Sequence, residues 1–185
     1  MFRHVIRAAL VAGVTSTMLA AAPAVAGAQW SPSLTVKLGA TLPVGDFGDA
    51  VATGYHVGIG AEFAQRLSPI GVRLELDYHE NELDEDVFGE TDLDWRHVAG
   101  IANVTFQRPG SSLYLIGGLG LYRGYISDID DSGDTNAGIN AGAGLRFNLT
   151  GFSTFVEARF HHLFNDNETV DASTQFIPIS FGVRF

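Results

Sequence analysis

The chain of 185 residues contains no cysteine, so disulfide bonds, thiol nucleophiles and thiolate metal sites are excluded. Basic residues are scarce, with 11 lysines and arginines against 21 aspartates and glutamates and a net charge of −10. Nucleic-acid phosphates require a basic face, so this balance predicts no nucleic-acid partner. Beyond residue 28 no apolar run is long enough for a transmembrane helix. If residues 29–185 lie in a membrane, they must form a closed barrel.

The N-terminus has the pattern of a secretory signal peptide. Arg3 and Arg7 give it a positive start, an apolar run covers residues 8–22, and residues 26–28 read Ala-Gly-Ala, a small-residue cleavage motif. An uncleaved anchor is the alternative, but the run is rich in alanine and barely reaches spanning length. We therefore predict a signal peptide at 1–28 and one domain at 29–185. Without Arg3 and Arg7, nine basic residues face 21 acidic ones, a net charge of about −12.

Eight segments alternate apolar and polar residues with a period of two, which predicts β-strands with one apolar and one polar face. The alternation is clearest in residues 72–79 and is blurred in the fourth segment by Ala99 and Ile101. The fifth segment is apolar on both faces, so its facing stays open; Gly118 and Gly120 would relieve crowding inside and favour Leu119 outside. The predicted strands are residues 34–42, 55–64, 72–79, 95–107, 113–126, 139–148, 156–161 and 176–185.

Short and long connections alternate along the chain. Tight turns are predicted at 68–71, 108–112 and 150–151, and long loops at 43–54, 80–94, 127–138 and 165–174. A soluble barrel with an apolar interior also alternates, but it has no reason to sort its connections by length. Turns at one end and loops at the other are typical of outer-membrane barrels.

Aromatic residues on the apolar faces fall into two groups, one near each end of the predicted strands. Such girdles are expected at the two membrane interfaces. Those near the turn end are Phe63, Phe106, Phe147 and Phe185, and those near the loop end are Tyr55, Tyr78, Tyr125 and Phe160.

The last ten residues alternate up to a terminal aromatic, with Phe181, Val183 and Phe185 on the apolar face. Together with residues 39–47 and 114–122, this pattern resembles the small OmpA/OmpX-type eight-stranded barrels of Gram-negative outer membranes. The resemblance implies an all-β, antiparallel up-and-down transmembrane barrel in the cell outer membrane. It also implies that Phe181, Val183 and Phe185 form the signal read by the barrel-assembly machinery. Outer-membrane lipid and lipopolysaccharide would surround the wall.

The polar faces carry charges of both signs. An eight-stranded barrel is only wide enough for its own side chains, and buried charges must pair. We predict a salt-bridged plug, with a polar conduit as the alternative. The residues predicted to form this network are Lys37, Glu62, Arg73, Glu75, Asp77, Arg146, Glu157 and Arg159, with Arg184 on the same face.

Residues 80–94 carry eight carboxylates and no base, and Asp128, Asp130 and Asp134 have alternate spacing like a calcium loop. Ile139 occupies the position that needs a bidentate Glu, so no specific metal site is predicted. These three aspartates stay weak candidates for divalent ions, including ions that bridge to lipopolysaccharide phosphates.

Residues 159–165 faintly resemble the His-x-Ser-Asn motif of lipid A deacylases, but Phe164 stands where the serine should follow His162. Without a nucleophile the motif predicts no catalytic residue, and no cofactor is expected. The sequence therefore predicts a non-enzymatic structural or surface-interaction barrel with acidic extracellular loops whose partner is unknown. A passive channel for small solutes is the alternative, and a lipid-modifying enzyme is the third hypothesis.

Overall fold

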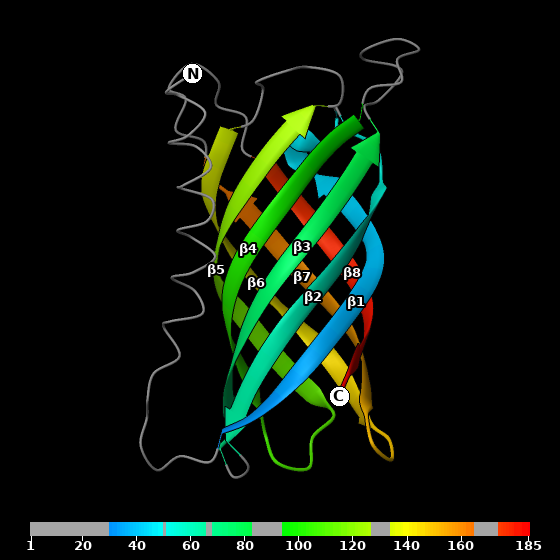
Figure 1. Ribbon diagram of the computed structural model, residues 1–185. Helices are drawn as coiled ribbons and strands as arrows, with labels where there is room; N and C mark the ends of the chain where they lie inside the picture. Colours follow the sequence, from blue (N-terminus) through cyan, green and yellow to red (C-terminus); the bar gives the residue numbers. More distant parts are fainter. Residues whose placement is uncertain (1–29, 50, 66–67, 83–93, 127–133, 165–173) are drawn as a thin grey trace, which may run out of the picture.

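The computed structural model describes residues 30–49, 51–65, 68–82, 94–126, 134–164 and 174–185. Eight antiparallel strands form one closed barrel in which neighbours in sequence are neighbours in space (Figure 1). A short 3-10 helix, η1 (Gly45–Phe47), follows the first strand. The strands are β1 (Trp30–Val44), β2 (Gly54–Gln65), β3 (Ile70–Glu82), β4 (Asp94–Gln107), β5 (Leu113–Ile126), β6 (Asp134–Asn148), β7 (Ser153–Leu163) and β8 (Thr174–Arg184).

The barrel is closed by pairing between β1 and β8, whose register runs from Thr35 opposite Arg184 to Val44 opposite Gln175. Beyond this ladder, Leu34 and Phe185 exchange two backbone hydrogen bonds of 2.8 and 3.0 Å. Closure removes the unpaired edges that an open sheet would present. The predicted eight-stranded antiparallel barrel is confirmed.

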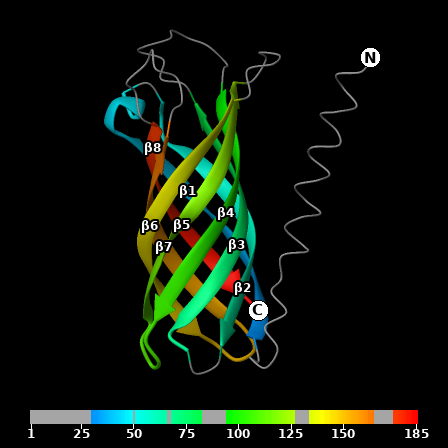
Figure 2. The same ribbon diagram turned by 90° about the vertical axis from the view of Figure 1, so that its left-hand side faces the viewer.

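The two ends of the barrel differ in the length of their connections. The short β2–β3, β4–β5 and β6–β7 connections lie at one end, named here the turn end, and Gly110 and Gly151 adopt positive φ angles of 80° and 91° there. Left-handed backbone of this kind favours glycine. The connections at the opposite, loop end are longer. The start of β1 and the C-terminus both lie at the turn end (Figure 2).

The outer wall is apolar over its whole circumference. Leu38 and Leu119 are 59% and 67% exposed, whereas inward neighbours such as Arg73 are buried. In β5 the exposed side chains are those of Leu113, Leu115, Leu119 and Leu121, so these residues form the outward face of the strand. No helix among the described residues has the length and hydropathy of a membrane span. An apolar wall around a polar interior is the arrangement expected of a barrel surrounded by lipid.

Several strands extend beyond their predicted bounds. Residues 134–138 and 80–82 were expected in loops but belong to β6 and β3, where they pair with β5 and with β2 and β4. Backbone hydrogen bonding to a neighbouring strand continues there although the apolar alternation has ended. Asp134 is therefore the first residue of a strand and not part of a twelve-residue metal loop.

Interior glycines allow close approach between neighbouring strands. A Cβ atom added at Gly142 would lie 2.1 Å from the carbonyl oxygen of Ala158 and 2.7 Å from the Cα of Arg159. Gly100, on the outward face of β4, has nothing within 4 Å of such an atom. Glycine is therefore required sterically at position 142 and not at position 100.

We expect Gly142→Ala to destabilise the barrel by about 1–3 kcal/mol, because the new methyl group overpacks against backbone that cannot move alone. Gly100→Ala is the matched control and should change stability by no more than about 0.5 kcal/mol. Urea unfolding of both variants in lipid vesicles measures the difference. Equal stability of the two variants would contradict the steric role of Gly142.

Leu119→Arg should destabilise the barrel by about 2–4 kcal/mol, because Leu119 lies midway along β5 and faces lipid. Leu113→Arg, at the start of the same strand, should cost only about 0–1 kcal/mol near the interface. Vesicle unfolding measurements compare the two variants. If the central arginine is tolerated as well as the terminal one, the assigned lipid-facing surface of β5 is wrong.

Candidate functional site

The barrel interior is filled by two groups of side chains, one above the other. The turn-end half contains a charged group, named here the ion-pair network: Lys37, Glu62, Arg73, Glu75, Asp77, Arg146, Glu157, Arg159 and Arg184. The loop-end half contains the histidine cluster: His56, His79, His97 and His161 with Tyr122 and Phe176.

Glu62 is the carboxylate nearest the turn end and is shared by several guanidinium groups. Arg73 and Arg146 each place a terminal nitrogen 2.9 Å from its Oε2 atom, and Arg184 Nε lies 3.5 Å from Oε1. Glu62 and Arg73 are directly opposite each other in the register of β2 and β3. The guanidinium groups of Arg73 and Arg146 also lie over the ring of Tyr114, at 5.5 and 4.9 Å from its centroid.

Further into the barrel, Glu157 and Glu75 continue the network. Glu157 accepts a 2.8 Å bond from Arg73 and a 2.7 Å bond from the Tyr114 hydroxyl, and its other oxygen lies 2.9 Å from Arg159 Nε. Arg159 in turn donates to Glu75 over 2.7 Å. One unbroken series of ion pairs therefore connects the turn end to the middle of the barrel.

Lys37 ends this series, with Nζ 2.8 Å from Glu75 and 2.9 Å from Asp77. Lys37 extends from β1 and Asp77 from β3, and Gly58 of β2 lies between them. A Cβ atom at Gly58 would lie 2.1 Å from Asp77 Oδ1 and 2.8 Å from Lys37 Cε. The absence of a side chain at this position lets the pair form across the intervening strand.

The histidine cluster follows from strand register. His56, His79 and His97 are directly opposite one another on β2, β3 and β4. Their rings stack with centroids 5.0 and 4.2 Å apart. Thr41 Oγ1 lies 3.1 Å from His56 Nδ1 and 2.8 Å from His79 Nδ1. Neighbouring inward positions on three strands thus place three imidazoles in one row.

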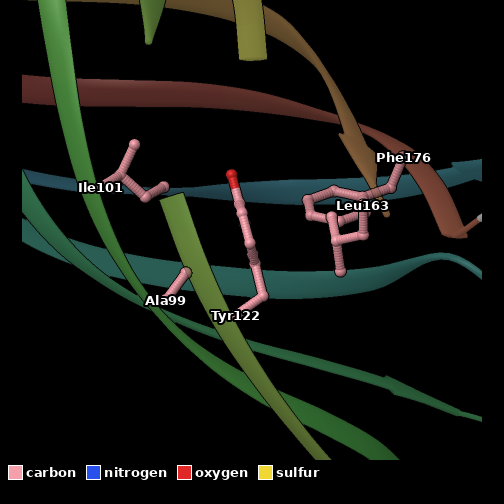
Figure 3. Close-up of a cluster of buried hydrophobic side chains, with 5 residues drawn as sticks. All are labelled: Ala99, Ile101, Tyr122, Leu163 and Phe176. Carbon is pink, nitrogen blue, oxygen red and sulfur yellow. The ribbon is translucent and has the colours of Figure 1, made fainter. Parts of the chain in front are cut away.

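Apolar and aromatic side chains complete the loop-end half. Phe176 stacks on His161 at 4.9 Å, and the Tyr122 hydroxyl lies 2.8 Å from His161 Nδ1. Figure 3 shows Phe176 and Tyr122 with the smaller apolar side chains packed inside the barrel. Ala99 and Ile101, which blurred the sequence pattern, face inward here. The interior is therefore dominated by ion pairs in one half, where Tyr114, Ile116 and Phe155 also pack, and largely aromatic in the other.

The structure brings all eight sequence-predicted network residues, together with Arg184, into the interior ion pairs. The sequence interpretation did not identify Tyr114, Asn103, His97 or Phe176 as interior partners. Each of them nevertheless stands at one of the alternate positions that face inward on its strand. These alternate positions were the signal from which their inward facing could have been predicted. The alternation alone does not predict which side chains from different strands contact one another.

The weak metal candidates receive no geometric support. Asp128 and Asp130 lie outside the described residues, and Asp134 begins β6. Within the ranges that the structure describes, no group of three or more histidines and carboxylates is placed to hold a metal ion. The stacked imidazoles place their ring faces, and not a common set of nitrogen atoms, toward one another.

One serine–histidine contact has the distance of a nucleophile and its base: Ser180 Oγ lies 2.8 Å from His56 Nε2. Both residues are buried among the rings of the histidine cluster. Phe164, which replaces the serine of the deacylase motif, is exposed. We interpret the serine–histidine contact as part of the interior packing, since Ser180 and His56 are almost completely buried.

A closed eight-stranded barrel with an apolar wall and a charged interior defines an outer-membrane β-barrel protein. The chain belongs to the outer membrane protein beta-barrel domain family, whose pattern matches residues 12–185. The protein is therefore located in the cell outer membrane. Its turn end faces the periplasm and its loop end the outside, since short turns are periplasmic in such barrels.

Solved structures share this fold. Neisserial surface protein A is 17% identical, with 83% of this chain and 95% of that chain covered and a TM-score of 0.60. The N-terminal barrel domain of Pseudomonas aeruginosa OprF is 19% identical, with coverages of 85% and 100% and a TM-score of 0.54. Yersinia pestis Ail in a phospholipid nanodisc is 19% identical, with coverages of 84% and 100% and a TM-score of 0.52. No curated protein matches the chain significantly in sequence.

We expect Arg159→Met to destabilise the barrel by about 3–5 kcal/mol, because it removes the cation that bridges Glu75 and Glu157 at 2.7 and 2.9 Å and leaves part of their buried charge uncompensated. Arg96→Met is the control: Arg96 pairs with Glu80 and Asp94 at the loop end, where its side chain is 33% exposed. Solvent-exposed pairs contribute little, so this variant should stay close to wild type. Denaturant unfolding in vesicles compares them, and similar losses in both would contradict the role of Arg159.

Proposed function

We propose that the protein is a structural or surface-interaction barrel of the outer membrane with no open solute pathway. The observation that carries this proposal is the set of ion pairs that join opposite walls of the barrel. In a ring of eight strands, β3 lies opposite β7 and β2 lies opposite β6. Arg73 of β3 meets Glu157 of β7 at 2.8 Å, and Arg146 of β6 meets Glu62 of β2 at 2.9 Å.

A third cross-barrel pair supports the same proposal. Arg159 of β7 reaches Glu75 of β3 at 2.7 Å, and neither side chain is more than 1% exposed. Charged side chains that meet across the full width of the barrel occupy the space that a solute would need. Above them, Phe176 of β8 contacts His97 of β4, again on opposite walls, with ring centroids 5.1 Å apart.

The outer rim at the loop end supports a surface role. The hydroxyl groups of Tyr55 and Tyr78 both donate to Glu80, which also pairs with Arg96. Tyrosines with polar partners suit the level of the lipid headgroups. We propose that lipopolysaccharide and outer-membrane lipid contact this rim, and that the acidic loops carry the specificity for an external partner. Divalent ions could link those carboxylates to lipopolysaccharide phosphates.

Assembly and chemistry complete the proposal. Phe181 and Phe185 face outward on and just beyond β8, which pairs with β1 to close the barrel. We propose that these residues and Val183 are recognised by the barrel-assembly machinery. We also propose that the protein is not an enzyme and needs no cofactor, because the deacylase-like segment lacks its serine.

The purified protein should show no steady conductance in planar bilayers, because the cross-barrel pairs fill the lumen. An open porin reconstituted in the same bilayers is the positive control for insertion and detection. Stable conductance steps of a single size from the wild-type protein would overturn the closed-barrel proposal. They would support the alternative function, a passive channel for small solutes.

A further inference from the structure

A cavity of about 1310 Å³ lies at the turn end of the barrel. Its lining includes residues of the β2–β3, β4–β5 and β6–β7 connections, and Glu62 lies at its inner limit. Three arginines belong to the lining: Arg108 on the β4–β5 turn, Arg146 on β6 and Arg184 at the end of β8. This region is named here the arginine cup.

The charges of the interior do not balance. The ion-pair network joins five cations, Lys37, Arg73, Arg146, Arg159 and Arg184, to four carboxylates, Glu62, Glu75, Asp77 and Glu157. The deeper cations each have a carboxylate oxygen within 3.0 Å. The excess positive charge therefore falls at the turn end, where Glu62 serves three guanidinium groups.

Arg184 is the least compensated cation of the network. Its Nε atom is 3.5 Å from Glu62 Oε1, and this atom is buried without a hydrogen-bond partner, as is the Nε atom of the largely buried Arg146. The Arg184 side chain is 19% exposed, in contrast to at most 2% for Lys37, Arg73 and Arg159. The cup thus contains guanidinium groups with remaining donor capacity.

We propose that the arginine cup is a binding site for a small oxyanion that carries a phosphate or carboxylate group. Guanidinium groups present a planar set of donors that matches these anions. Arg184 would supply the principal contact, with Arg146 beside it and Arg108 at the solvent-exposed lip. The bound anion would supply the negative charge that the network lacks. The site is compatible with a closed barrel, because Glu62, which belongs to its lining, is almost fully buried and pairs with the deeper Arg73.

Two sources could provide such an anion, a soluble periplasmic compound or a lipid headgroup of the inner leaflet. The geometry favours the soluble source. The cup opens at the turn end of the barrel, and Arg146 and Arg184 lie on the inward faces of their strands, whereas lipid surrounds the apolar outer wall. A headgroup would have to pass over the turns to reach Arg184.

Inorganic phosphate is the probe for the soluble source. The barrel, residues 29–185, is placed in phosphatidylcholine nanodiscs and titrated with phosphate while chloride keeps the ionic strength constant. Arginine Nε–H resonances report binding, and thermal unfolding followed by heat-modifiable gel migration reports stabilisation. We expect saturable binding by the wild type and a loss of affinity of about tenfold or more in Arg184→Gln, which removes charge-assisted hydrogen bonds.

Two further variants make the test specific. Arg123→Gln removes an exposed arginine of β5 at the loop end and should leave phosphate affinity unchanged. Arg108→Gln changes only the lip of the cup and should weaken binding less than Arg184→Gln. The Arg108→Gln variant also keeps the test decisive if Arg184→Gln fails to fold. Equal phosphate affinity in Arg108→Gln, Arg123→Gln and wild type would then contradict binding of the anion in the arginine cup.

Other outcomes would overturn the inference. An absence of saturable phosphate binding, or equal affinity in wild type and Arg184→Gln, would show that the cup holds no oxyanion. Stabilisation that depends on Arg184 in phosphatidylglycerol nanodiscs, without any effect of free phosphate, would assign the cup to lipid headgroups instead. None of these results bears on conductance, so they are independent of the proposed closed barrel.

Discussion

The narrow width of a closed eight-stranded ring is the constraint on which the rest of this structure depends. The lumen has room only for side chains, so every inward residue must be matched to residues on the opposite wall. Charges placed there lose their hydration and must find partners of opposite sign. The ion pairs between β3 and β7 and between β2 and β6 meet this requirement with residues that lie 84 positions apart in the chain. The same contacts tie opposite walls together and close the lumen.

The same constraint explains where small and aromatic residues lie inside. Where a long side chain crosses the lumen, a neighbouring inward position is glycine: Gly58 lies beside Lys37 and Asp77, and Gly142 beside Arg159. In the loop-end half, flat rings fill the width instead, and the row of imidazoles stacks along neighbouring strands. An interior of ion pairs in one half and stacked rings in the other therefore meets a single requirement, which is to fill a narrow cylinder while giving its most deeply buried charges partners of opposite sign.

Sequence patterns were sufficient to predict the fold and the facing of most strands. Alternation reports which face meets lipid, and the bounds of β5 were predicted as the structure has them. Strand ends were less predictable. Residues such as Asp134 pair with a neighbouring strand through backbone hydrogen bonds, and their side-chain type does not predict this pairing. The pairing of residues on strands joined by long connections was not predicted. His79 is opposite His97 because of the register between β3 and β4, and the length of the long β3–β4 connection does not determine that register. The histidine cluster could therefore not be inferred from the alternation of residues alone.

Buried ion pairs are weak evidence for stability, since well-packed apolar groups often serve as well. Their role here is better understood as specification of the inner face. A strand that carries Arg73, Glu75 and Asp77 on one face cannot turn that face to lipid, where a single arginine near the midplane costs about 2–4 kcal/mol. β5 shows the contrast, because it lacks such charges inside and depends on Gly118, Gly120 and its neighbours to choose its face. The charged residues therefore determine which face of each strand that carries them points into the barrel. The surplus cation lies at the turn end, where water can reach it.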